Sequence, residues 1–213
     1  MIDRLIFLEE IGKAFVLKRF RPNIRAHFLK ANIDEVPYKL FGALFYLTQA
    51  ITAFFYFYQV FPHFQVASAI KVFLFAFVYW TATSLALAVL FGSALYFYLD
   101  IIIFNRTKQM EEVLQDFLRL VSENLKGGMA FERALWSSIK PEFNVLAAEV
   151  RLAAKRVMTG EDVESALREF TKKYDSAMLT RSFELIVEGM KGGGRIVEII
   201  DRVIETIEET KEL

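Results

Sequence analysis

The sequence predicts an all-α membrane protein in which a hairpin of two membrane helices precedes a cytoplasmic bundle of about six helices. Two apolar runs, at about residues 40–61 and 72–99, contain no Asp, Glu, Lys, Arg or His, and a membrane span needs roughly 20 apolar residues. After residue 105 the apolar residues recur at helical spacing, and no strand pattern of useful length occurs. We therefore expect three segments: residues 1–38, 39–104 and 105–213.

The amino-terminal segment, residues 1–38, is expected to form surface helices on the cytoplasmic side. Over residues 2–20 an apolar face lies beside Lys and Arg, which is typical of an interfacial amphipathic helix. Packing of this face on the carboxyl-terminal domain is the alternative. Pro22 interrupts this pattern, and a second short helix is expected over residues 24–31. Asp34 then suits the N-cap of the first span, and Pro37 is tolerated in its first turn.

The distribution of Lys and Arg predicts the topology of the hairpin. These residues flank the outer ends of the two spans. The connection at residues 62–71 contains only one of them, Lys71, in addition to the titratable His63. By the positive-inside rule, both termini are cytoplasmic and the connection faces outside. No cleavable signal peptide is visible, so the first apolar run would serve as the insertion signal. The span interiors lack the central charges that a proton relay, an intramembrane protease or a transporter needs.

Two features of the second span suggest contacts. Asp100 follows its apolar run, and we expect this carboxylate at the headgroup level, within reach of Arg106. Ser84, Ala88 and Gly92 are small residues that recur every four positions, and such a stripe lets helices approach closely. Two interpretations remain open for the stripe: packing inside the hairpin, or a seam for another membrane subunit.

Glycines divide the cytoplasmic segment into helices. Gly127 and Gly128 are expected to end the first helix, Gly160 a later one, and the run of Gly192, Gly193 and Gly194 the one before the last. Asp175 or Ser176 would cap the helix that ends at the glycine run. The expected helices cover residues 110–121, 131–139, 143–157, 163–170, 178–190 and 196–213. The apolar face expected for the third of them includes Leu146, Val150, Leu152 and Ala153.

The same segment contains an internal repeat. A glycine, a glutamate four residues later and an Ala-Leu pair occur twice at an offset of about 32 residues, and a weaker third copy follows. Each glycine would end a helix with a positive φ, each glutamate would lie in the first turns of the next helix, and each Ala-Leu pair would pack inward. The period is close to that of tetratricopeptide repeats, but their signature Trp, Gly-Tyr and Pro positions are not evident. The copies begin at Gly128, Gly160 and Gly194 and continue with Glu132, Ala134 and Leu135, with Glu164, Ala166 and Leu167, and with Glu198 and Ile200.

Composition argues against most catalytic chemistry. The chain has no Cys, no pair of histidines at metal spacing and no Gly-x-Ser-x-Gly motif. The glycine run between Lys191 and Arg195 invites a phosphate-loop interpretation, but the Walker pattern and its preceding strand are missing. Carboxylates are expected at exposed helical positions. The net charge is zero, without the one-sided basic stripe of a nucleic-acid surface. We expect no enzyme, metal, cofactor or nucleic acid.

Three stretches of the cytoplasmic segment resemble the type II secretion F domain: residues 113–135, residues 160–167, and residues 182–194 leading into the last helix. The nearest likeness is to the archaeal pilus, archaellum and tight-adherence branch, in which a helix similar to residues 28–33 precedes a span. Family members carry further spans after the F domain. Because this chain stops at Leu213, the resemblance implies a truncated chain, a second polypeptide that supplies the rest, or a degenerate gene.

The resemblance implies a platform protein of a type IV pilus-like machine in the cell membrane. Such a protein has no catalytic site, engages a hexameric secretion ATPase through its F domain, and passes the conformational work of the ATPase to pilin-like subunits. A homo-oligomer or an additional membrane subunit is expected beside the lipid bilayer. The rival hypothesis is a membrane-tethered helical adaptor or scaffold for signalling that binds no ATPase.

We expect the helix breaks to form the edge that contacts the ATPase, because the backbone is least constrained there. Gly127, Gly128, Gly160 and the run from Gly192 to Gly194 are the candidate hinges or contact loops, and a plain helix break is the alternative interpretation for each. The charged residues that we select as candidate contacts are Arg133, Lys140, Arg195 and Glu198.

Overall fold

The computed structural model describes residues 2–16, 18–33, 35–60, 69–191 and 196–211. Every regular element in these ranges is a helix, which confirms the all-α fold class. The chain divides into two compact units, Met1–Ile101 and Ile102–Leu213. Each unit has its own packing and is described by itself below.

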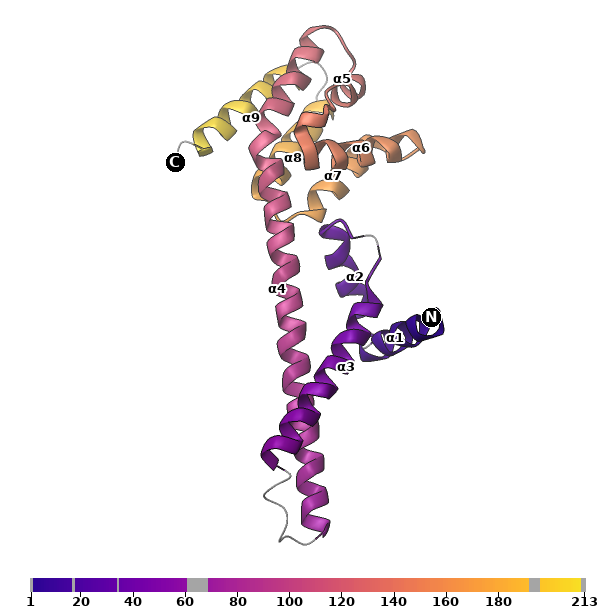
Figure 1. Ribbon diagram of the computed structural model, residues 1–213. Coiled ribbons are helices and arrows are strands. Elements are labelled where there is room, and N and C mark those ends of the chain that lie inside the picture. Colours follow the sequence, from indigo (N-terminus) through magenta and orange to yellow (C-terminus); the bar gives the residue numbers. More distant parts are fainter. Residues whose placement is uncertain (1, 17, 34, 61–68, 192–195, 212–213) are drawn as a thin grey trace. The chain divides into compact units, whose positions relative to one another are not determined.

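The first unit contains three helices and the beginning of a fourth (Figure 1). They are α1 (Ile2–Phe15), α2 (Arg21–Lys30) and α3 (Tyr38–Phe55), which continues as the π-helical turn η1 (Tyr56–Val60), and the first part of α4 (Ala69–Lys126).

Two of these helices have the length and composition of membrane spans. Tyr38–Tyr58 and Ile70–Lys126 both qualify, and the most apolar windows of the two are only 22% and 6% buried within the structure. The core helix of a soluble protein would be mostly buried instead. Exposed apolar surface of this extent needs lipid or another apolar partner around it, which favours a membrane protein.

Polar and aromatic pairs join α3 to α4. The hydroxyls of Thr52 and Ser84 lie 3.4 Å apart, and Trp80 Nε1 donates to Gln49 Oε1 at 3.0 Å. The ring of Tyr56 meets the ring of Trp80 edge-on, with centroids 6.1 Å apart. Because apolar side chains gain little by leaving lipid for each other, interhelical hydrogen bonds and close packing hold such a hairpin together.

Helix α1 crosses α3 with backbone against backbone. A Cβ atom added at Gly12 would lie 1.8 Å from the carbonyl oxygen of Tyr38, and one added at Gly42 would lie 2.0 Å from that of Leu8. Only glycine fits at either position, because a carbonyl of the facing helix occupies the place of a side chain. The sequence analysis did not single out this pair of glycines.

Helix α2 begins earlier than expected, at Arg21 rather than at residue 24. Pro22 lies in its first turn, where the missing amide hydrogen costs nothing. The guanidinium of Arg21 turns back to the end of α1 and donates to the carbonyls of Val16, at 3.1 Å, and Lys13, at 2.5 Å. Asp34, the expected cap of the first span, lies outside the described residues, and the N-cap position of α3 is Pro37.

The second unit packs five α-helices around the carboxyl-terminal part of α4, so that the six helices expected for this segment are present in the described residues (Figure 1). The expected second span and first cytoplasmic helix are one helix here. No glycine or proline lies between Ser93 and Lys126 to interrupt it. The other elements are α5 (Phe131–Ser137), the 3₁₀ turn η3 (Pro141–Phe143), α6 (Asn144–Met158), α7 (Val163–Lys173), α8 (Ala177–Lys191) and α9 (Ile196–Lys211).

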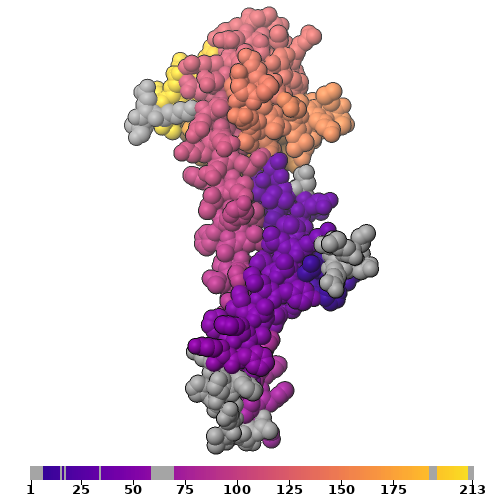
Figure 2. All heavy atoms as spheres, in the orientation of Figure 1, coloured from indigo at the N-terminus to yellow at the C-terminus, as the bar shows by residue number. Residues whose placement is uncertain are grey.

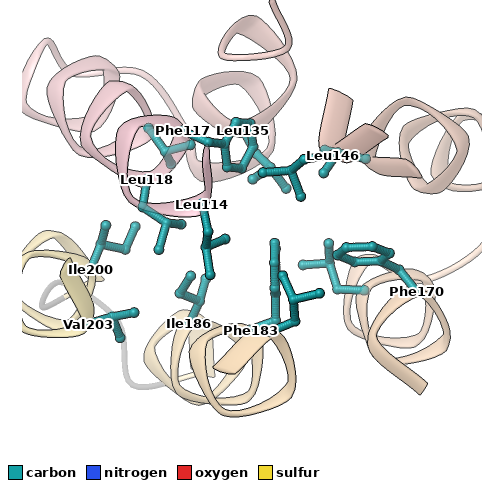
Figure 3. Packing of buried hydrophobic residues seen from close by; sticks show 14 of the residues in the cluster. Leu114, Phe117, Leu118, Leu135, Leu146, Phe170, Phe183, Ile186, Ile200 and Val203 are labelled. Atoms are coloured by element: carbon teal, nitrogen blue, oxygen red, sulfur yellow. The ribbon is translucent and has the colours of Figure 1, made fainter. Parts of the chain in front are cut away.

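One hydrophobic core holds this unit together. In Figure 3 side chains from α4, α5, α6, α7, α8 and α9 point toward one another. Leu114, Phe117 and Leu118 of α4 have no exposed surface. The space-filling view shows the orange atoms of α6 and α7 against the pink carboxyl-terminal part of α4 (Figure 2). Burying side chains of this size contributes roughly 1.5–3 kcal/mol each, so α4 belongs to the core of the unit.

One detail of this unit differs from the prediction, and another decides between two predicted helix caps. Leu152, placed on the inward face of α6, is 46% exposed. Glu149 lies inward on that helix instead. The alternatives for the cap of α8 resolve to Ser176, whose Oγ accepts a hydrogen bond from the amide of Leu179 at 3.0 Å.

The first two glycines of the repeat end their helices as predicted, and the third, Gly194, lies outside the described residues. Gly128 has a φ of +84° and Gly160 a φ of +102°. After Gly128 the amide of Met129 donates to the carbonyl of Asn124, and after Gly160 the amide of Glu161 donates to the carbonyl of Arg156, both at 3.2 Å. This is the hydrogen-bond pattern of a Schellman motif. The Ala-Leu pairs that follow are at most 1% exposed, so they pack inward as expected.

Replacing Gly128 or Gly160 with alanine is expected to cost about 1–2 kcal/mol each, because a Cβ atom disfavours left-handed backbone. Nothing lies within 4 Å of an added Cβ at either glycine, so backbone strain alone sets the cost. Denaturant unfolding followed by the fluorescence of Trp136, in a Trp80→Phe background, measures it. Gly128→Asn and Gly160→Asn are the controls and should cost less, since asparagine tolerates this conformation. Alanine variants as stable as the parent would contradict the assignment.

Candidate functional site: a buried ionic cluster and the glycine turns

A buried carboxylate joins three elements of the second unit. Glu149 of α6 is 5% exposed. Its Oε1 accepts hydrogen bonds from Arg106 Nη2 at 3.3 Å and from Tyr174 Oη at 2.5 Å. Lys173 Nζ donates to both carboxylate oxygens, at 2.8 and 3.0 Å. The cluster thus ties α6 to α4 and to the end of α7.

The electrostatics of the cluster depend on Glu149. An isolated buried carboxylate is costly, but here two cations and a phenol satisfy its lone pairs. Burial, together with the hydrogen bond to Glu149, raises the pKa of Tyr174 well above its usual value. Tyr174 therefore keeps its proton and acts as a donor. The cluster contains one carboxylate, Glu149, and two basic side chains, Arg106 and Lys173. The Nε of Arg106 is buried without a hydrogen-bond partner among the described residues.

The sequence contained a signal for Glu149 that the analysis of exposed carboxylates missed. Glu149 is three residues after Leu146 and four before Ala153, both of which are buried. These spacings place it on the apolar stripe of α6, where a lone acid needs an internal partner. The partner expected for Arg106 was also wrong. Arg106 binds Glu149, whereas Asp100 Oδ1 lies 2.7 Å from His27 Nε2.

A ladder of polar pairs attaches α9 to α4. Asp201 Oδ1 accepts from Ser122 Oγ at 2.6 Å, and its Oδ2 lies 2.9 Å from Lys126 Nζ. Two turns later on α9, Glu208 pairs with Arg119. The spacing of three to four residues along α4 and seven along α9 keeps all the pairs on facing stripes.

Acid is expected to weaken this ladder. The hydrogen bond from Ser122, and next that from Lys126, lowers the pKa of Asp201. A carboxyl whose pKa is lower in the folded state contributes stability above its unfolded pKa of about 3.9, and loses it as pH falls through the folded value. Unfolding midpoints of the second unit should therefore drop as pH goes from 5 to 3.

Asp201→Asn is the control for this prediction. It should lower the midpoint at pH 7 and reduce the loss between pH 5 and 3, because the titrating group is gone. An equal loss in the parent and the variant would show that other carboxyls carry the acid sensitivity.

The structure locates the candidate hinge and contact residues as follows. Gly127 and Gly128 follow α4, and Gly160 follows α6. Arg133 is exposed on α5, and Glu198 is exposed in the first turn of α9. Gly192, Gly193, Gly194 and Arg195 lie outside the described residues.

Lys140 is the candidate that the structure brings together with α4. Its Nζ lies 3.7 Å from Glu142 Oε1. Both side chains line a notch of about 430 Å³, together with Asp116, Arg119 and Glu123 of α4. The notch is rich in charge and open to solvent, so it is a polar contact surface rather than a ligand cavity.

Each described glycine turn lies beside an exposed methionine, which the sequence analysis did not note. Met129 follows Gly128 and is 40% exposed, and Met158 precedes Gly160 by two residues and is 86% exposed. Met158 in particular buries little of its surface in the fold. Its flexible thioether side chain suits an adaptable contact with a partner.

The stripe of small residues in the second span divides between two environments. Ser84 faces α3 through Thr52, Ala88 is half-buried, and Gly92 is exposed with nothing within 4 Å of an added Cβ. Ser84 therefore packs inside the hairpin, whereas Gly92 leaves space beside α4.

Comparison with known families identifies the helical segment. Residues 117–213 match the family model described as Type II secretion system (T2SS), protein F. Residues 117–213 belong to the type II secretion F-domain family. No curated protein and no solved structure matches the chain significantly. The match supports a platform protein of the secretion or pilus type in general, and the proteins of this family are structural platform components.

Three of the four residues of the ionic cluster lie within the matched segment. Glu149, Lys173 and Tyr174 lie within residues 117–213, whereas Arg106 precedes them on α4. The cluster thus ties the F domain to the part of α4 that comes before it. The glycine turns and their methionines belong to the F domain as well.

Proposed function

We propose that the chain is the membrane platform component of a type IV pilus-like assembly or secretion machine. In this role it couples a cytoplasmic hexameric ATPase to the movement of pilin-like subunits. Both termini lie in the cytoplasm, the two spans cross the cell membrane, and residues 62–71 face outside. The likeness of residues 28–33 favours the archaeal pilus and archaellum branch.

The observation that carries this proposal is helix α4. It runs from Ala69 to Lys126, contributes an apolar span to the first unit, and forms part of the core of the second. No glycine or proline interrupts α4 between Ser93 and Lys126. The proposal assigns to this shared helix the transmission of movement from the F domain. Glu149 supports the same role, because its hydrogen bonds with Arg106, Lys173 and Tyr174 join α6 to α4 and to the end of α7.

The glycine turns are the proposed docking edge for the ATPase. The turns are open at Gly128 and Gly160, where an added Cβ meets nothing within 4 Å. Met129 and Met158 offer exposed apolar side chains beside them. Arg133, Lys140 and Glu198 supply exposed charge on neighbouring elements. Apolar anchors with charged surroundings are typical of protein interfaces. Gly192, Gly193, Gly194 and Arg195 are proposed to extend the same edge.

A binding experiment with the purified full chain in detergent tests the docking edge. The cognate ATPase should bind at micromolar concentration, and the double variant Met129→Ser, Met158→Ser should weaken binding by about tenfold, as expected for loss of interface anchors. Leu152→Ser is the matched control, because Leu152 is also an exposed apolar residue of α6 but lies away from the turn. It should leave binding unchanged.

Two outcomes would contradict the proposal. If the folded parent did not bind the ATPase at micromolar concentration, the ATPase would not be its partner. That result would favour a membrane-tethered adaptor. Equal binding by the parent and the methionine variant would move the docking edge away from the glycine turns.

A further inference from the structure

The first unit contains a crevice at the boundary between its apolar and its ionisable residues. The apolar run of α3 begins just after Lys39, and that of α4 ends just before Asp100. Phe41 and Leu99, which lie one or two residues inside these limits, line the same crevice. Both helices therefore change from lipid-like to water-like composition at this place, as helices do at the edge of the hydrocarbon layer.

The crevice is lined mainly by apolar residues, and there is free space beside Gly92, which forms part of its wall. It measures about 440 Å³, and Ile24 and Phe28 of α2 form its wall opposite Leu95 of α4. Gly92 lines it too, and nothing lies within 4 Å of a Cβ added there. An apolar space of this volume can hold a hydrocarbon chain.

The acid at the polar end of the crevice has a hydrogen-bond partner on α2. His27 Nε2 lies 2.7 Å from Asp100 Oδ1, and the His27 ring stacks on that of Tyr96 with centroids 4.5 Å apart. Asp100 is the acid nearest to the crevice in sequence, and its partner is His27. No Lys or Arg of α2 pairs with Asp100 among the described residues.

These cations form a strongly basic segment. Residues 18–33 contain five Lys and Arg and no Asp or Glu. Arg21 is bound to backbone carbonyls. Arg25 and Lys30 make no ion pair within the described ranges. Arg25 is three residues before Phe28, and Lys30 is three after His27, so each lies on the helix surface next to a residue that lines the crevice.

We propose that this crevice binds an anionic phospholipid, with an acyl chain over Gly92 and the phosphate held by Arg25 and Lys30. Anionic headgroups at the cytoplasmic surface attract basic segments beside a span. The positive charge of Arg25 and Lys30 favours an anionic lipid over the other candidate occupants of the crevice. A second copy of the chain would bring a second set of α2 cations to the same place, and an uncharged apolar helix would leave the cations without a partner.

Lipid retention by the purified full chain in neutral detergent tests the site. Native mass spectrometry would compare dioleoylphosphatidylglycerol with dioleoylphosphatidylcholine. The parent should retain the anionic lipid preferentially, and Gly92→Leu should weaken its apparent affinity by about tenfold, because leucine fills the space of the acyl chain. Ser93→Leu is the matched control, since Ser93 is exposed on the next position of the same helix. It should retain the lipid.

Charge variants test the headgroup independently. Arg25→Gln with Lys30→Gln should reduce binding of phosphatidylglycerol and leave phosphatidylcholine unchanged. Arg151→Gln with Lys155→Gln, which removes two exposed cations of α6, should change neither. Inorganic phosphate alone should not raise the unfolding temperature, which distinguishes a lipid site from a free-anion site.

Three results would overturn the proposal. Equal retention of the two lipids by the parent would remove the charge selectivity. Unchanged lipid binding in Gly92→Leu would place the lipid elsewhere. Conversion of an oligomer to a monomer by Gly92→Leu, with lipid selectivity intact, would assign the crevice to a second copy of the chain.

Discussion

Replacing Glu149 with alanine is expected to lower the free energy of unfolding of the F-domain unit by about 3 kcal/mol, because it leaves buried cations without their counter-charge. Arg106 and Lys173 would face each other across the vacant position, and Tyr174 would lose its acceptor. Denaturant unfolding of the Trp80→Phe protein measures the loss. Trp136 is then the only tryptophan in the chain, and it packs against the core of this unit.

Two control variants separate charge from packing. Glu149→Gln keeps the size and one acceptor oxygen, so it should cost less than alanine. The triple variant Arg106→Met, Glu149→Leu, Lys173→Met should recover much of the stability, because apolar residues of similar volume often replace a buried ion cluster without loss. A triple variant less stable than Glu149→Ala would show that the cluster stabilises the unit beyond its need for charge balance.

Replacing Gly12 or Gly42 with leucine is expected to separate α1 from α3. Each new side chain would occupy the place of a backbone carbonyl of the other helix, at 1.8 or 2.0 Å from its Cβ. Backbone atoms cannot move aside as a flexible side chain can, so the crossing must open. The cost of about 3 kcal/mol, at the upper end for overpacking, is comparable to the whole stabilisation of a short docked helix.

Spin-label distances measure this separation directly. The chain has no Cys, so labels at Phe7→Cys on α1 and Tyr46→Cys on α3 report on this pair of helices alone. Both positions are exposed. The distance distribution should be narrow in the parent and should broaden in Gly12→Leu and Gly42→Leu. Gly92→Ala is the control, because an added Cβ there meets nothing within 4 Å. A narrow distribution in the leucine variants would contradict the crossing.

Helix boundaries show where local sequence was sufficient and where it was not. Gly128 and Gly160 end their helices as predicted, because left-handed backbone is a property of the residue itself. The end of the second span was not predictable in this way. A change from apolar to charged side chains alters the solvent around a helix but leaves its hydrogen bonds intact, so α4 continues through residues 100–107.

The sequence by itself determined the features that depend on one residue or one helix turn: the apolar spans, the helical periods, the glycine caps and the inward Ala-Leu pairs. Only the tertiary structure decided which charges are buried and which helices touch. Glu149 and Leu152 are three residues apart on one helix, yet the acid is buried and the leucine is 46% exposed. The reason is that burial depends on which side chains the rest of the chain brings to that face, and those partners are distant in sequence.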